Sequence, residues 1–162
     1  MLKILALLLS LVLMCPTALA DGVKYPATQA LLQEMQERDV LCLPDGLDAE
    51  GREWAVMQAS DSSGRTWDIR FGFDRAGHTC LLRVPGFISF HEMEMVSVLR
   101  VCNSLNADYR FVRFHVEGDC TVTATMLLRF DQAAPGPLTA EAATLLTEIL
   151  VDVYPQLVEF HL

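Results

Sequence analysis

A histidine and a cysteine two residues apart, His78 and Cys80, are the side chains of this sequence best suited to chemistry. Residues i and i+2 of a β-strand point to the same face, so the imidazole could take the thiol proton and produce a nucleophilic thiolate. Such a pair also needs a group that orients the base and donors for an oxyanion, and the sequence places neither. The alternative is a core cysteine beside a histidine at the strand end. We favour this alternative and expect no catalytic residue.

His91, Glu92 and Glu94 form the other group of potential metal ligands. A zinc site on a helix uses two histidines four residues apart, and His91 has no such partner. The sequence also lacks a C-x-x-C pair, the phosphate-binding and dinucleotide-binding glycine patterns, and the G-x-S-x-G motif. We therefore expect no metal and no cofactor.

Four of the five cysteines lie downstream of residue 20, and an even number in an exported chain permits disulfides. Four cysteines allow three complete connectivities, and their spacing does not choose among them. Three of them fall on the apolar face of their predicted element, where a free cysteine packs as a small hydrophobe. Disulfides and free thiols therefore both remain open for Cys42, Cys80, Cys102 and Cys120.

The first 20 residues have the pattern of a cleaved secretion signal. Lys3 is their only charge, an apolar run from 4 to 14 follows, and a small-x-small pattern ends at Ala20. The run is shorter than the roughly 20 apolar residues that cross a bilayer. We expect cleavage after Ala20, a periplasmic or secreted product with no stable membrane anchor, and a single domain over residues 21–162.

The composition is acidic. The chain of 162 residues has 12 Lys and Arg against 21 Asp and Glu, a formal net charge of −9, and no basic residue follows Arg129. Phosphate backbones are bound by clustered basic side chains, so we expect no nucleic-acid partner. An acidic surface favours cationic or neutral partners, although a solvated face that maintains solubility is the plainer interpretation.

Hydrophobic periodicity predicts three helices and about six strands in the order α-ββββ-α-ββ-α. The helices are predicted near residues 26–38, 91–106 and 139–154. The strands are predicted at residues 40–43, 54–59, 67–73, 78–84, 110–117 and 120–130. Short connections indicate antiparallel pairing, and runs of strands separated by helices are typical of an α+β fold with helices on one face of the sheet.

Local signals predict where these elements begin and end. Pro44-Asp45-Gly46 is expected to end the first strand. Ser89 and Glu92 form a capping box for the second helix, and Asn106 is expected to end that helix in a left-handed conformation. Thr139 is expected to cap the last helix.

The alternation of side chains predicts which faces are buried. The clearest half-buried strand has an inward set of Trp67, Ile69, Phe71 and Phe73. A wet polar face is expected from Thr121, Thr123 and Thr125. The second helix has a predicted buried stripe of Met95, Val98, Leu99, Cys102 and Leu105. Pro155 is expected to end or kink the last helix.

The stretch from Leu99 to Asp119, LRVCNSLNADYRFVRFHVEGD, combines a helix ending in Asn103-x-x-Asn106, a basic and aromatic segment, and a hairpin that turns at Gly-Asp. In this pattern the chain resembles the YbjN-domain family of small bacterial proteins, whose fold is similar to that of type III secretion chaperones. The resemblance extends in element order over residues 26–158. Exported members often carry a paired-cysteine signature ahead of the second helix, where this sequence has only Cys80.

The resemblance implies a binding or regulatory module and brings no agreed reaction. It draws attention to Asn103 and Asn106 as structural or interaction residues, since side-chain amides near a helix end can satisfy free carbonyl groups. We therefore expect an exported, non-enzymatic, chaperone-like or adaptor-like protein that binds another polypeptide, or itself as a homodimer. The alternatives are a small thiol-dependent hydrolase and an envelope protein that binds a small ligand.

Overall fold

The structure is a computed structural model that describes residues 22–131 and 133–161. The predicted secretion signal, residues 1–20, lies outside the described residues. The helices are α2 (Pro26–Glu37), α3 (Met95–Asp108) and α4 (Pro135–Leu157), with short 3-10 helices η1 (Glu92–Glu94) and η2 (Val158–Phe160). The strands are β1 (Cys42–Leu47), β2 (Glu53–Ser60), β3 (Thr66–Phe73), β4 (Thr79–Ser89), β5 (Val112–Val116) and β6 (Thr121–Arg129).

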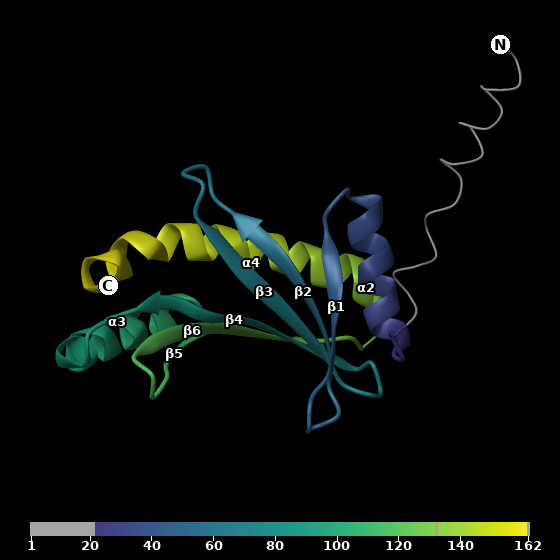
Figure 1. The fold of residues 1–162 in the computed structure, drawn as a ribbon, viewed down its shortest axis with the longest axis horizontal. Helices are drawn as coiled ribbons and strands as arrows, with labels where there is room; N and C mark the ends of the chain where they lie inside the picture. Colours follow the sequence, from purple (N-terminus) through teal and green to yellow (C-terminus); the bar gives the residue numbers. More distant parts are fainter. Residues whose placement is uncertain (1–21, 132, 162) are drawn as a thin grey trace, which may run out of the picture.

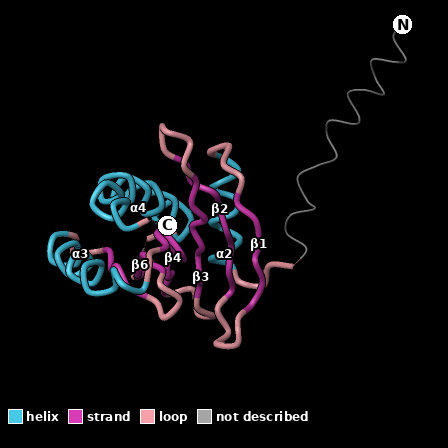
Figure 2. The backbone as a smooth tube through the Cα atoms, turned by 60° about the vertical axis from the view of Figure 1, so that its left-hand side comes forward, coloured by secondary structure: helices cyan, strands magenta, loops and turns pink. Residues whose placement is uncertain are grey.

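Within the described residues, six strands form one antiparallel sheet in the order β1-β2-β3-β4-β6-β5. The element order α-ββββ-α-ββ-α confirms the α+β fold expected from the sequence. α4 runs the length of the molecule, with α2 and β1 near one end and α3 near the other (Figure 1). A second view shows α2 beside β1 and β2 and α3 beside the β6 end of the sheet (Figure 2).

The inner face of the sheet and the helices share one hydrophobic cluster. The inward set of β3 that was predicted from period-two alternation is buried in it, as are the corresponding residues of the neighbouring strands, including Leu82, Val84, Val122 and Ala124. Burial of one Leu or Phe side chain contributes about 1.5 to 3 kcal/mol. The cluster therefore holds the helices against the sheet.

Two strands continue beyond their predicted ends. The prediction that Pro44-Asp45-Gly46 ends the first strand is wrong, because β1 passes through these residues with a register shift between Pro44 and Gly46. An edge strand tolerates proline, since one side of its ladder has no partner. β4 continues past Val84 by the same device, with a register shift between Val84 and Ile88.

The first helix begins at Pro26 as predicted, but the predicted starts of the second and last helices are wrong. Ser89 ends β4, and α3 begins at Met95 after η1, with no side-chain capping hydrogen bond. α4 begins at Pro135, whose fixed φ suits the first helical position, so Thr139 lies inside the helix. α4 also continues past Pro155.

Two predicted faces need correction. Leu99 is 41% exposed, because Val98, Cys102 and Leu105 form the buried stripe of α3 and the next residue lies about 100° around the helix. Thr123 is buried, whereas the other two threonines of its row keep partial exposure. Thr123 lies on a central strand opposite the longer side chain of His115, and a short side chain between such neighbours loses contact with water.

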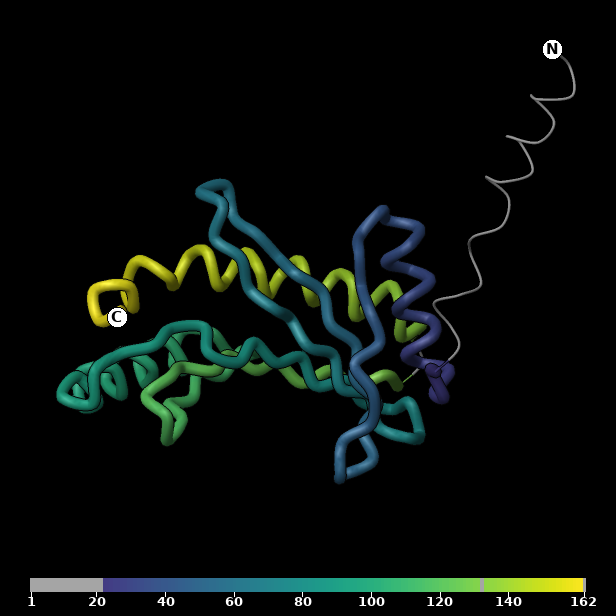
Figure 3. Tube along the Cα trace, viewed as in Figure 1, coloured from purple at the N-terminus to yellow at the C-terminus, as the bar shows by residue number. Residues whose placement is uncertain are grey.

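One carboxylate, that of Asp61, fixes the turn between β2 and β3. It accepts hydrogen bonds from the backbone N–H groups of Ser63 (2.8 Å) and Arg65 (3.0 Å) and pairs with the Arg65 guanidinium. That guanidinium lies over the ring of Tyr154 in α4, 3.7 Å from its centroid. The hairpin thus crosses and contacts α4 (Figure 3).

The pKa of Asp61 predicts an acid-sensitive contribution to stability. Burial raises the pKa of this carboxyl, but hydrogen bonds from Ser63 and Arg65 outweigh burial and lower the pKa from 3.8 to about 2. The unfolded chain therefore binds more protons, so the contribution is complete above the unfolded pKa and is lost as the pH falls towards 2. Melting temperatures of wild type and Asp61→Asn should differ by a constant amount above about pH 5 and converge below about pH 4. A difference in melting temperature that persists unchanged to pH 2 would contradict this role of the Asp61 carboxylate.

Candidate functional site

The structure separates the two residues that the sequence suggested for thiol chemistry. Cys80 is fully buried on the inner face of β4, and burial raises the pKa of its thiol far above the ordinary value. His78 lies just before β4 and is exposed. Because a thiol enzyme needs an accessible thiolate beside its base, this pair is not arranged for nucleophilic catalysis.

Among the described residues, the four cysteines are free. Cys42, Cys80 and Cys102 are buried, and Cys120 is partly exposed. Burial raises the pKa of Cys42 to about 12 and the pKa of Cys102 to about 11, so both thiols are protonated at neutral pH. Of the two states that the sequence left open, the structure has free thiols.

Of the potential metal ligands set aside in the sequence analysis, Glu92 and Glu94 lie in η1, and His91 precedes it. Over residues 22–131 and 133–161, no three His, Cys, Asp or Glu side chains gather in a way that could hold a metal ion. The same part of the chain contains no helix that is long and apolar enough to cross a membrane.

Asn106 closes one edge of the sheet. Its Oδ1 accepts a hydrogen bond from the N–H of Phe114 (2.7 Å), and its Nδ2 donates to the carbonyl oxygen of the same residue (3.0 Å). The amide thus takes the place of a neighbouring strand at Phe114 of β5, which is an edge strand. The left-handed stop predicted at Asn106 is wrong, since this residue lies within α3. Asn103 is exposed on α3 and takes no part in this pairing.

β1 forms the opposite edge of the sheet. The middle of β1 is protected against pairing with a further strand, because Pro44 has no N–H to donate and the register shift there distorts the ladder. Residues 40–43, named here the open edge, precede both features: Val40 and Leu41 lead into β1, and Cys42 and Leu43 are its first residues. The N–H of Val40 donates to the carbonyl oxygen of Met35 (2.8 Å). Alternate N–H and C=O groups of an edge strand point away from the sheet, and two leucines of the open edge, Leu41 and Leu43, are 71% and 40% exposed.

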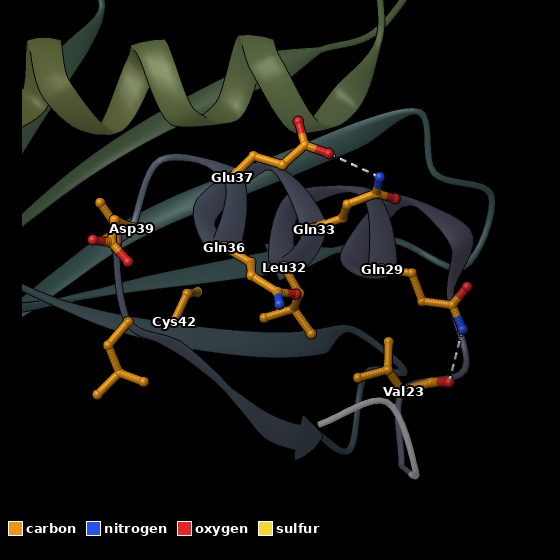
Figure 4. A pocket seen from close by; sticks show the side chains of 10 residues that line it. Val23, Gln29, Leu32, Gln33, Gln36, Glu37, Asp39 and Cys42 are labelled. Carbon is orange, nitrogen blue, oxygen red and sulfur yellow. Dashed lines mark hydrogen bonds between the residues drawn. The ribbon is translucent and has the colours of Figure 1, made fainter. Parts of the chain in front are cut away.

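A groove of about 960 Å³ lies between α2 and the open edge (Figure 4). Its apolar lining consists of Val23, Leu32, Val40, Leu41 and Cys42. Its polar lining consists of Gln29, Gln33, Gln36, Glu37 and Asp39. Apolar walls with a few ordered polar groups are typical of binding sites.

Hydrogen bonds order the polar wall of the groove. The Nε2 of Gln33 donates to Oε1 of Glu37 (2.9 Å), and the Nε2 of Gln29 donates to the carbonyl oxygen of Val23 (3.3 Å) (Figure 4). Asp39 adopts a left-handed backbone with φ of 61°, which Asp and Asn tolerate well, and this turn leads the chain from α2 to β1. Glu37 and Asp39 make the lining negative, because no Lys or Arg is among the lining residues.

A buried carboxylate holds the start of α2. Glu53 of β2 is 2% exposed, and it accepts hydrogen bonds from the backbone N–H groups of Lys24 (2.6 Å) and Tyr25 (2.8 Å). N–H groups at a helix N-terminus have no partner within the helix and favour negative charge. Glu53 was not identified from the sequence. Glu53 lies two residues before the buried Ala55, so the alternation of β2 places both side chains on the inner face.

A glycine allows α4 to approach α2 closely. A Cβ at Gly136 would lie 2.5 Å from the carbonyl oxygen of Ala30, a distance that real Cβ atoms do not tolerate. The first turn of α4 therefore packs directly on the backbone of α2. This contact and the Glu53 carboxylate together fix the helical wall of the groove.

A second hollow, of about 490 Å³, lies beside the turn between β5 and β6. Arg83 and Glu117, which both line it, form a salt bridge (3.0 Å). Its lining contains no large apolar side chain, being completed by Pro85, Gly86, Gly118, Asp119, Thr121 and Thr123. It therefore has fewer apolar side chains for a partner to contact than the groove beside the open edge.

Comparison with known proteins points to the fold alone. No family model matches the sequence, and no curated protein matches it. A solved structure that does match is the crystal structure of YbjN from E. coli, described as a proposed transcription regulator. The two chains share 10% sequence identity with a TM-score of 0.52, over 83% of this chain and 96% of YbjN. The protein therefore has a YbjN-like fold.

Proposed function

We propose that this protein is an exported, non-enzymatic binding module that captures an extended segment of another polypeptide at the open edge of β1. The observation that carries the proposal is the groove between α2 and residues 40–43. An extended segment that joins an exposed sheet edge is held by main-chain hydrogen bonds, while pockets receive its alternate side chains. Export rests on the secretion signal that the sequence predicts at residues 1–20.

The contrast between the two sheet edges supports this location. The amide of Asn106 already occupies the Phe114 backbone groups at the β5 edge. The open edge has exposed leucines and a groove beside it instead. A partner strand can therefore form both main-chain hydrogen bonds and apolar contacts at β1.

A binding role is supported by the chemistry of the remaining side chains. The thiol of Cys80 is buried and protonated, and capture of a segment needs no activated group. YbjN is described as a regulator, which accords with a non-enzymatic role. The net charge of −9 favours a polypeptide partner over nucleic acid.

Synthetic peptides of about nine residues, with leucine at alternate positions and varied charge between them, test the proposal. We expect at least one peptide to shift the backbone amide NMR signals of residues 23–43. Leu41→Ser should weaken that binding about tenfold, since it removes the most exposed apolar side chain of the open edge.

The matched control is Leu127→Ser, the same substitution at a residue of β6 that is 53% exposed and lies away from β1. This control should bind as the wild type does. Polypeptide capture at the open edge is wrong if no peptide shifts these amides, if the shifts map elsewhere, or if both variants weaken binding equally.

A further inference from the structure

We propose that the segment bound in the groove alternates apolar residues with Lys or Arg, so that its cations meet Glu37 and Asp39. This inference rests on the proposed function and names the chemical class of the partner. Both carboxylates belong to the groove lining, which contains no Lys or Arg. The nearest basic residue along the chain, Arg38, is already paired with Glu34 at 2.7 Å.

The geometry of an edge strand assigns the two sets of partner side chains. Successive residues of a paired strand point to opposite faces of the sheet. On the outer face the partner meets Leu41 and Leu43, which favour apolar residues. On the face of α2 it meets Leu32, and Glu37 and Asp39 line the same groove farther along the chain. A Lys or Arg suits that side, because its methylene stem packs on an apolar side chain while its head reaches a carboxylate.

The same charges disfavour a second copy of this chain as the occupant. Symmetric pairing of two open edges would bring two acidic grooves together. The segment from Glu37 to Asp45 supplies only Arg38 as a cation, and Glu34 of the same helix holds it. Copies with a net charge of −9 also repel each other in general. A cationic segment of another polypeptide avoids both the contact between two acidic grooves and the repulsion between two negatively charged copies.

Three synthetic peptides test the charge rule, each with leucine at alternate positions and with lysine, glutamine or glutamate between them. We expect the lysine peptide to bind the purified protein about tenfold more tightly than the glutamine peptide, the magnitude that a few surface ion pairs provide. The glutamate peptide should bind most weakly. At about 1 M salt, where the Debye length is about 3 Å, the lysine and glutamine peptides should bind equally.

The groove variant is Glu37→Gln combined with Asp39→Asn. Glutamine can still accept the hydrogen bond from Gln33, and asparagine tolerates the left-handed backbone at position 39, so the fold is preserved while two charges are lost. The matched control, Glu148→Gln with Glu159→Gln, removes two exposed charges, one near the middle of α4 and one in η2. We expect the lysine preference to vanish in the groove variant and to persist in the control.

The outcomes separate this inference from the proposed function. If the glutamine and lysine peptides bind equally well and Leu41→Ser weakens both, capture of a polypeptide stands and the charge rule is overturned. If the control pair abolishes the preference as fully as the groove pair, the overall charge selects the partner and the inference is also overturned. If no peptide shifts the amides of residues 23–43, the proposed function itself fails.

Discussion

Replacing Gly136 with alanine is expected to destabilise the protein by about 3 kcal/mol, the upper range for an overpacked contact. The added Cβ would lie 2.5 Å from the Ala30 carbonyl oxygen and 2.9 Å from its carbonyl carbon. Both atoms belong to the backbone, so no side chain can move aside to make room. α2 must shift away from α4, and the helical wall of the groove shifts with it.

Thermal unfolding followed by circular dichroism measures this effect, which should appear as a melting temperature lower by about 10 °C. Gly118→Ala is the matched control, because a Cβ there meets no atom within 4 Å. Peptide binding at 20 °C below the melting temperature of the variant should also be weaker if α2 has moved. Equal stability of the two alanine variants would show that α2 and α4 do not pack in this way.

Glu53→Ala is expected to cost about 2 to 4 kcal/mol, because it leaves the N–H groups of Lys24 and Tyr25 without their acceptor in a partly buried place. Glu53→Gln should recover part of the loss, since its amide oxygen can still accept one of these bonds. Hydrogen exchange of the α2 amides should accelerate in Glu53→Ala more than exchange in β4 and β6 does.

Glu50→Ala serves as the control for Glu53→Ala. It removes the same side chain three residues earlier, at an exposed position in the turn before β2. The melting temperature of this control should stay within about 2 °C of the wild type, as surface substitutions usually do. Similar losses in both variants would mean that the Glu53 carboxylate does not hold α2.

The sequence predicted the element order and most of the inward faces because these depend on a repeated pattern. Four residues of β3 alternate without interruption, and one error among them would not change the assignment. Helix starts depend on single residues instead. Ser89 and Glu92 satisfy the capping-box spacing, yet β4 extends across Ser89 because the register shift after Val84 lets its pairing with β6 continue.

The candidate site was not predictable from the sequence, because it is made by residues that no local pattern connects. The groove needs α2 beside the edge strand, and that position depends on Glu53 and Gly136, which are far apart in the chain. The role of Asn106 was only partly anticipated. Its amide was expected to satisfy local carbonyl groups, and it instead pairs with both backbone groups of Phe114 on the next strand.

The side-chain amide of Asn106 has a consequence for assembly. A sheet that is open at both borders can add a strand at each of them, and such additions can run on without limit from one molecule to the next. In this protein the amide occupies the backbone groups of Phe114 at one border, while proline and a register shift shorten the accessible part of the other. If β1 captures a segment as proposed, we expect strand addition to the described sheet to stop after that segment. The expected complex has one protein to one captured segment.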